Sequence, residues 1–213
     1  NAAAFGLPAS YDADKTKNYE IGVKGDALNH SLSYDASIYY IDWKNIQLIL
    51  VDATSGSGYY TNAGGAKSQG VELSVESRPL TGLTLSAWAA YNNAALIQAF
   101  PATSTAFGRS GDRLPFSSRV SGNVGIDQEF PLAGNIRGFA GGSISYVGDR
   151  QGVFTSTANR QNFPSYARTD LRAGLKRNSW TVNLFMNNAA DRRAALKGGI
   201  GTIYPAAFNY IQP

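Results

Sequence analysis

The feature that most constrains this chain is an alternation of apolar and polar side chains with a period of two residues. Between residues 31 and 40 the even positions hold Leu, Tyr, Ala, Ile and Tyr, whereas the odd positions through residue 37 hold Ser, Ser, Asp and Ser. This period is typical of a β-strand with one apolar and one polar face, because an amphipathic helix repeats every ~3.6 residues. The pattern returns along most of the sequence, so we predict an all-β, antiparallel fold.

The alternation predicts eight strands, and the segments that join them differ regularly in length. The predicted strands cover residues 17–27, 31–50, 59–77, 83–95, 114–130, 136–149, 164–176 and 180–190. Short connections at 28–30, 78–82, 131–135 and 177–179 alternate with longer ones at 51–58, 96–113, 150–163 and 191–213. Outer-membrane β-barrels place short turns at the periplasmic rim and long loops outside the cell. The sequence therefore predicts a transmembrane β-barrel segment with its long loops on the extracellular side.

The two faces of the predicted strands agree with a membrane location. Mean hydropathy is only −0.22 although 43% of the residues are hydrophobic, as expected for strands with one apolar face. Aromatic residues fall near strand ends, where they suit the interface between hydrocarbon and water, although aromatics also flank turns in soluble all-β proteins. The polar face is ionic. Its charged residues are Glu72, Glu76, Arg119, Asp127, Arg137, Arg168, Asp170 and Arg172.

Composition and spacing argue against several other functions. The formal net charge is +4, and no basic block marks a surface for nucleic acid. The chain has no Cys and a single His, His30, which excludes thiolate sites and sites with two imidazoles. Glu72 and Glu76 would lie ~13 Å apart along one strand, too far to act as a catalytic pair. We predict no enzyme activity, no metal site and no cofactor.

Strand counting predicts that this segment does not close a barrel alone. If the turn at 28–30 is periplasmic, then residues 1–16 and 191–213 both lie outside the cell, whereas complete bacterial barrels have their termini on the periplasmic side. The strands at 17–27 and 180–190 would also leave unpaired backbone groups in lipid, where each costs several kcal/mol. We therefore expect other strands to complete the barrel.

Several motifs give the sequence a family resemblance. Residues 62–73 read NAGGAKSQGVEL, 19–24 read YEIGVK, and 38–47 read IYYIDWKNIQ. The segments PLTGLTLS at 79–86, GDRLP at 111–115 and YARTDL at 166–171 follow in order. In this order and spacing the chain resembles the C-terminal part of a TonB-dependent outer-membrane receptor over about residues 17–193. Residues 188–191 read NAAD where the family usually has NLFD, which predicts a looser strand end.

The resemblance implies a fold, a location and partners. It places the whole chain, residues 1–213, at about strands 14 to 21 of a barrel of roughly 22 strands, without the plug domain or the closing strand. The charged residues of the polar face would face the lumen and contact the plug within it. The apolar face would contact lipid and lipopolysaccharide, and TonB would act through the plug. The implied function is active uptake of a scarce nutrient, most of all a ferric siderophore, across the outer membrane of a Gram-negative bacterium. A passive porin and a soluble carbohydrate-binding module remain the alternatives.

Ligand contacts are expected in the long loops. Seven basic and three acidic side chains occupy the connections at 96–113, 150–163 and 191–213 and the strand ends beside them, so the outer mouth is mildly cationic. Such a mouth suits an anionic ferric siderophore and suits lipopolysaccharide phosphate equally, while aromatic side chains would also stack on a sugar. The candidate substrate-binding residues are Tyr59, Tyr60, Phe107, Arg109, Arg113, Arg150 and Arg160.

Overall fold

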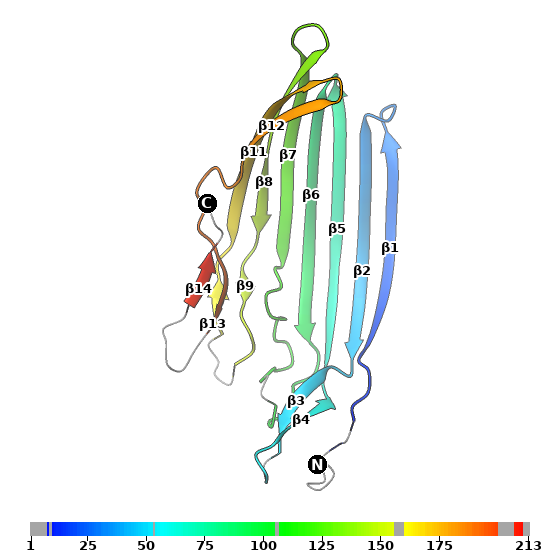
Figure 1. Ribbon diagram of the computed structural model, residues 1–213. Coiled ribbons are helices and arrows are strands. Elements are labelled where there is room, and N and C mark those ends of the chain that lie inside the picture. The colour runs from blue at the N-terminus through cyan, green and yellow to red at the C-terminus, as the bar shows by residue number, and fades with distance from the viewer. Residues whose placement is uncertain are drawn as a thin grey trace.

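Most of the chain forms one curved, twisted layer of antiparallel strands (Figure 1). The computed structural model describes residues 8, 10–52, 54–104, 107–155, 160–199 and 207–210. The main sheet contains, in order, β1 (Lys15–Ala27), β2 (Leu32–Lys44), β5 (Gly65–Leu80), β6 (Leu83–Leu96), β7 (Val120–Pro131), β8 (Ile136–Val147), β11 (Tyr166–Arg177) and β12 (Trp180–Met186). The prediction of an eight-stranded antiparallel segment is confirmed.

Six short strands form three separate hairpins beside the main sheet. They pair β3 (Gln47–Val51) with β4 (Gly58–Asn62), β9 (Arg150–Gln151) with β10 (Asn162–Phe163), and β13 (Ala195–Gly199) with β14 (Ala207–Tyr210). Among the described residues, no helix is long and apolar enough to cross a membrane.

The two ends of the main sheet differ. At the turn end, neighbouring strands are joined by the tight connections 28–31, 81–82, 132–135 and 178–179. At the loop end lie all three small hairpins and the described residues of the segment 97–119 (Figure 1). The predicted alternation of short and long connections is therefore present.

The register of the sheet separates an apolar face from a polar face. One row of directly paired residues runs Ile21, Ile38, Val71, Tyr91 and Val120 across five strands. The adjacent row contains Gly22, Ser37, Glu72, Ala90 and Ser121. Apolar side chains of the first row are exposed, from 48% for Val120 to 69% for Ile21. A single layer with an exposed apolar face fits a wall that meets lipid on that side.

Four predicted strand boundaries differ from the structure by four to six residues, and all four lie at the loop end. The segment predicted as a strand at 31–50 leaves the main sheet after Lys44, and the one at 59–77 enters it only at Gly65. Asn45 and Gly64 adopt positive φ values of 56° and 80° there, which bends the hairpin out of the sheet. Residues 114–119 form a loop, because β7 begins at Val120.

The fourth error concerns the last predicted strand. Residues 187–190 are a turn after β12 rather than part of the strand. Asn188, the first residue of the NAAD segment, is 4% exposed. Its backbone N–H donates to Asp170 Oδ1 at 2.9 Å, and its side-chain oxygen accepts from the Arg192 N–H at 2.9 Å. Polar bonds of Asn188, which the family motif also has, anchor this strand end, and Ala189 and Ala190 stand where the motif has apolar side chains.

Candidate functional site at the loop end of the sheet

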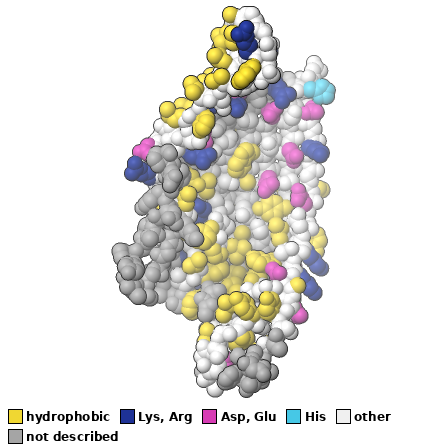
Figure 2. Space-filling view, in the orientation of Figure 1, with side chains coloured by type: hydrophobic (Ala, Val, Ile, Leu, Met, Phe, Trp, Pro, Cys, Tyr) yellow, Lys and Arg dark blue, Asp and Glu magenta, His cyan; other side chains and the backbone are white. Residues whose placement is uncertain are grey.

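The polar face of the sheet carries the residues predicted to face a lumen. Register pairing places Glu72, Glu76, Asp127, Arg137, Arg168, Asp170 and Arg172 on this one face. Arg119 is exposed and lies one residue before β7. Acidic and basic side chains intersperse on this face over the half of the sheet nearer the turn end (Figure 2).

Ion pairs on the polar face cross from strand to strand. The Arg172 guanidinium donates to Asp127 Oδ1 at 2.8 Å, bridging β11 and β7 over Gly141 of β8. A Cβ atom at Gly141 would overlap the Asp127 carboxylate, so this glycine leaves the room that the bridge needs. The bridge therefore depends on one residue of the strand between its partners.

A second ion pair lies nearer the turn end, between residues that were not among those predicted to face the lumen. Lys176 Nζ donates to Glu129 Oε1 at 2.9 Å and lies 5.4 Å from the centroid of the Phe139 ring. Their positions in the sequence could have identified both residues. Glu129 lies two residues after Asp127 and Lys176 lies four residues after Arg172, and such even spacings on a strand place side chains on the same face. Every partner in these two pairs is at least 30% exposed, so each pair contributes little to folding stability. Their arrangement instead supplies an ordered, hydrated ionic wall.

The loop end contains an apolar core of its own. Ile46, Leu48 and Leu50 alternate along the β3 hairpin and pack with Ala66 and Leu96, all of them 9% exposed or less. Residues packed around this core are Trp43, Tyr59, Ala63, Phe100, Leu114 and Phe154. We call this set the loop core. Apolar side chains gather at this end in Figure 2.

Gly64 is required for the bend that brings the loop core together. Its φ of 80° lies in a region that side chains other than glycine rarely adopt, and a Cβ there would sit 2.8 Å from the Phe100 ring. Phe100 in turn meets Phe154 edge to face, with ring centroids 5.6 Å apart. A glycine in the NAGG motif thus allows three connections to pack as one body.

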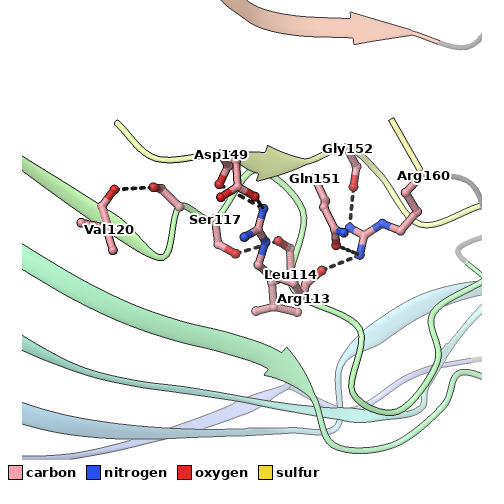
Figure 3. A network of polar contacts seen from close by, with 9 residues as sticks. Arg113, Leu114, Ser117, Val120, Asp149, Gln151, Gly152 and Arg160 are labelled. Carbon is pink, nitrogen blue, oxygen red and sulfur yellow. Dashed lines mark hydrogen bonds and ion pairs between the residues drawn. The ribbon is translucent and has the colours of Figure 1, made fainter. Parts of the chain in front are cut away.

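Two arginines tie the connections 97–119 and 148–165 together (Figure 3). Arg113 is 9% exposed and donates to the Asp149 carboxylate at 2.7 Å and to its backbone carbonyl at 3.0 Å. Arg160 donates to the Arg113 carbonyl at 2.8 Å and to Gln151 Oε1 at 2.9 Å. Its guanidinium lies 4.7 Å from the Phe154 ring centroid, and burial lowers the Arg160 pKa from its ordinary value. These hydrogen bonds and the ring contact hold the two loops together.

Arg150 connects two other segments farther along the sheet. It is 9% exposed, donates to the Ala195 carbonyl at 2.9 Å, and lies 5.7 Å and 5.5 Å from the rings of Phe163 and Tyr166. It therefore joins the β9 strand to the segment that follows β12.

The structure divides the seven predicted ligand residues into two groups. Arg113, Arg150 and Arg160 are committed to contacts within the loops, and Tyr59 is half-buried beside the loop core. The other three are open to solvent: Tyr60 is 54% exposed, Phe107 is 43% exposed, and Arg109 is also exposed. Tyr60 stands 5.5 Å from the Tyr11 ring. The open group offers two aromatic faces and one guanidinium at the loop end.

A one-layer antiparallel meander with an apolar face, an ionic face, tight turns at one end and packed loops at the other defines a segment of a transmembrane β-barrel wall. Residues 2–189 match the family described as TonB dependent receptor-like, beta-barrel. The chain belongs to this family, whose receptors lie in the outer membrane of Gram-negative bacteria.

The individual proteins that this chain resembles are also named as receptors. The metal-pseudopaline receptor CntO of Pseudomonas aeruginosa is 30% identical over 186 residues, which is 86% of this chain and 25% of that protein. The ferric yersiniabactin uptake receptor FyuA of Yersinia pestis superposes with a TM-score of 0.72 at 21% identity, over 93% of this chain and 28% of that one. The siderophore receptor PiuA of Acinetobacter baumannii gives 0.65 at 23% identity, over 85% and 25%. The chain thus spans about a quarter of each relative.

Proposed function

We propose that this chain forms part of the wall and the outer loops of a receptor that takes up a metal chelate, above all a ferric siderophore, by TonB-dependent active transport. The family match over residues 2–189 carries the proposal. A relative named as a metal-pseudopaline receptor and structural neighbours named as siderophore receptors support a metal chelate as the cargo. The role is transport rather than catalysis.

Within that receptor the two faces of the sheet have separate tasks. The ionic wall of Asp127, Arg172, Glu129 and Lys176 would contact the receptor's own plug domain, through which TonB acts, and hold water around it. The apolar face would contact lipid, and further strands would pair with the free edges of β1 and β12. A plug domain and a closing strand outside residues 1–213 are part of this proposal.

The open group at the loop end is proposed to contact the cargo. A ferric siderophore is a large, often anionic chelate, and Tyr60, Phe107 and Arg109 present aromatic faces and a positive charge to it. Arg113, Arg150 and Arg160 would act indirectly, by holding the loops in place.

The test uses the intact parent receptor in cells. Binding of radiolabelled ferric siderophores is measured on chilled cells, and uptake is measured on warm cells with and without proton-motive force. We expect energy-dependent uptake, and we expect Phe107→Ala with Arg109→Ala to weaken binding. Arg78→Ala, an exposed arginine at the turn end, is the charge-matched control. Uptake that persists without proton-motive force would indicate a passive porin instead.

A further inference from the structure

The segment that precedes β1 is tied to the β3–β4 hairpin through one side chain, that of Asn62. The Asp12 backbone N–H donates to Asn62 Oδ1 at 2.7 Å, and Asn62 Nδ2 donates to the Asp12 carbonyl at 2.8 Å. The same nitrogen also donates to the Asn45 carbonyl at 2.9 Å, at the bend where the hairpin leaves the main sheet. One carboxamide group thus joins three parts of the chain.

These hydrogen bonds require an amide side chain at position 62. An amide offers an acceptor oxygen together with a nitrogen that carries two hydrogens. In Asn62 the oxygen and both hydrogens are used. A leucine would form none of these bonds, and an aspartate would keep only the bond that its oxygen accepts. Asn62 begins the NAGG motif, so the residue that makes the tie lies two positions before the glycine that makes the bend.

Two further hydrogen bonds attach the same segment to the loop end. Trp43 Nε1 donates to the Asp14 carboxylate at 2.8 Å, and Gln47 Nε2 donates to the Asp12 carbonyl at 3.3 Å. Trp43 is itself one of the residues packed around the loop core. Residues 11–14 therefore have a fixed position relative to that core.

The tie places the Tyr11 ring beside the Tyr60 ring. Tyr11 comes directly before Asp12, and its ring centroid lies 5.5 Å from that of Tyr60, with the two ring planes tilted by 37°. Tyr60 pairs with Ile49 across the hairpin, on the side opposite the loop core. Tyr11, Tyr60 and Ile49 are 49%, 54% and 40% exposed, so they form an apolar, largely aromatic surface that solvent reaches.

We infer that Asn62 is a positioning residue for cargo binding: by holding residues 11–14 in place, it adds the Tyr11 ring to the open group of Tyr60, Phe107 and Arg109. This inference rests on the proposed function, because it takes the cargo to be a metal chelate. Aromatic faces bind flat and apolar parts of a ligand. A ring that is already held in place loses less conformational freedom when the ligand binds than a free ring does. Asn62 thus acts through Tyr11 rather than by contact with the cargo.

The test measures equilibrium binding of a radio-iron chelate to chilled cells that carry the intact parent receptor. The probes are the ferric complexes of a catecholate chelator and of a hydroxamate chelator, and the complex that the wild-type receptor binds is then used for the variants. We expect Asn62→Leu to raise the Kd about tenfold and Tyr11→Ala to raise it by a similar factor, because each change removes one ring from its place. The rate of uptake at saturating chelate should stay the same.

The double variant separates a positioning role from a merely structural one. If Asn62 acts through Tyr11, its loss has no further effect once Tyr11 is alanine, so the double variant should bind as Tyr11→Ala does. A general loss of structure would weaken binding whether or not Tyr11 is present. Asn62→Asp, which keeps the bond from the Asp12 N–H, should give a Kd between those of the wild type and Asn62→Leu.

A covalent link should replace the hydrogen bonds of Asn62. Residues 1–213 contain no cysteine, so Asp12→Cys with Asn62→Cys introduces the only two thiols in this part of the receptor. Joining the thiols with a short bis-maleimide should restore most of the lost affinity, whereas capping each thiol with iodoacetamide should leave binding as weak as in Asn62→Leu. Asn135→Leu is the matched control, because it removes an amide that is hydrogen-bonded to Asn178 at the turn end, and it should leave the Kd unchanged.

Two results would overturn the inference: an unchanged Kd in folded Asn62→Leu, or a Kd in the double variant that is raised by the product of the two single factors. Heat-modifiable gel migration verifies that each variant is folded, and Asn62→Asp serves if Asn62→Leu is not. Either result leaves the uptake proposal standing, because the wild-type receptor still binds its chelate. A wild-type receptor that binds neither ferric complex would overturn the uptake proposal, and this inference with it.

Discussion

The membrane-facing sheet and the loop end of this protein are stabilised in opposite ways. In the sheet, apolar side chains such as Ile38 and Leu73 remain 54% and 46% exposed, because the layer has no second layer to cover it. At the loop end, Leu96 is 2% exposed and Leu48 is 9% exposed within a packed core. The sheet depends on lipid and neighbouring strands for burial, whereas the loops supply their own. Loops with their own core can present cargo contacts at fixed positions.

The largest expected effect is on accessibility, since the two ends of the sheet should lie on opposite sides of the membrane. An epitope tag inserted in the parent receptor at Gly56, where a Cβ atom would meet nothing within 4 Å, should be detected on intact cells. A tag at Asn29, in a tight turn, should be detected only after permeabilisation. Ser104 is a poor site for a tag, because it is 2% exposed. Detection of the Asn29 tag on intact cells would reverse the orientation.

Shortening a buried side chain of the loop core should destabilise the loops, as it does in the core of a water-soluble protein. Leu48→Ala should lower the local free energy of unfolding by about 2–5 kcal/mol, because it leaves a cavity against Leu96. Ile49→Ala, the next residue on the opposite side of β3, is 40% exposed and serves as the control with a much smaller loss. Hydrogen exchange of the amides in 96–116 measures both. Equal losses would show that the loops are not one packed body.

The apolar, lipid-facing side of the sheet should instead be destabilised by an added charge. Ile38→Arg should cost about 2–4 kcal/mol in the bilayer, because an arginine near its midplane loses hydration. Ser37→Arg, on the polar face of the same strand, should cost far less. Unfolding of the parent receptor in lipid vesicles gives both values, and the reverse ranking would invert the assignment of the two faces.

The smallest expected effects compare ion pairs in the two regions. Double-mutant cycles on Arg113 with Asp149 should give a coupling of about 1.5–3 kcal/mol, because the bond is charge-assisted and the arginine is 9% exposed, although the Asp149 side chain is 57% exposed. Cycles on Arg172 with Asp127 should give about 0.2–1 kcal/mol, because both side chains are exposed to water. A larger coupling for the second pair in the parent receptor would mean that the plug or another wall segment shields it.

The strands and their faces could be predicted from sequence because a two-residue period is a local property. The row through Ile21, Ile38 and Val71 was visible as alternation within each strand before any pairing was known. The break at Asn45 and Gly64 was missed, because the alternation of Ile46, Leu48 and Leu50 continues the pattern of β2 in a different hairpin. Periodicity does not show where a strand leaves one sheet and joins another.

The candidate site was harder to predict than the fold. Sequence reasoning grouped the loop arginines as cargo contacts because they share charge and a loop location. Arg113 and Arg150 are buried and Arg160 is half-buried, because segments 36 to 47 residues apart supply their carboxylate and carbonyl acceptors. Nothing in the local sequence distinguishes them from the exposed Arg109.

The sequence by itself determined an all-β wall with one lipid-facing and one ionic side. It could do so because the strand period, the turn residues and the order of the motifs are local properties of short segments. The tertiary structure alone decided which loop residues are open and which segments Asn62 ties together. Asp12 and Asn62 are 50 residues apart, and the pairing of β1 with β2 and the bend at Asn45 bring them within hydrogen-bond distance. Packing and register depend on pairings between distant segments, and a local pattern does not contain them.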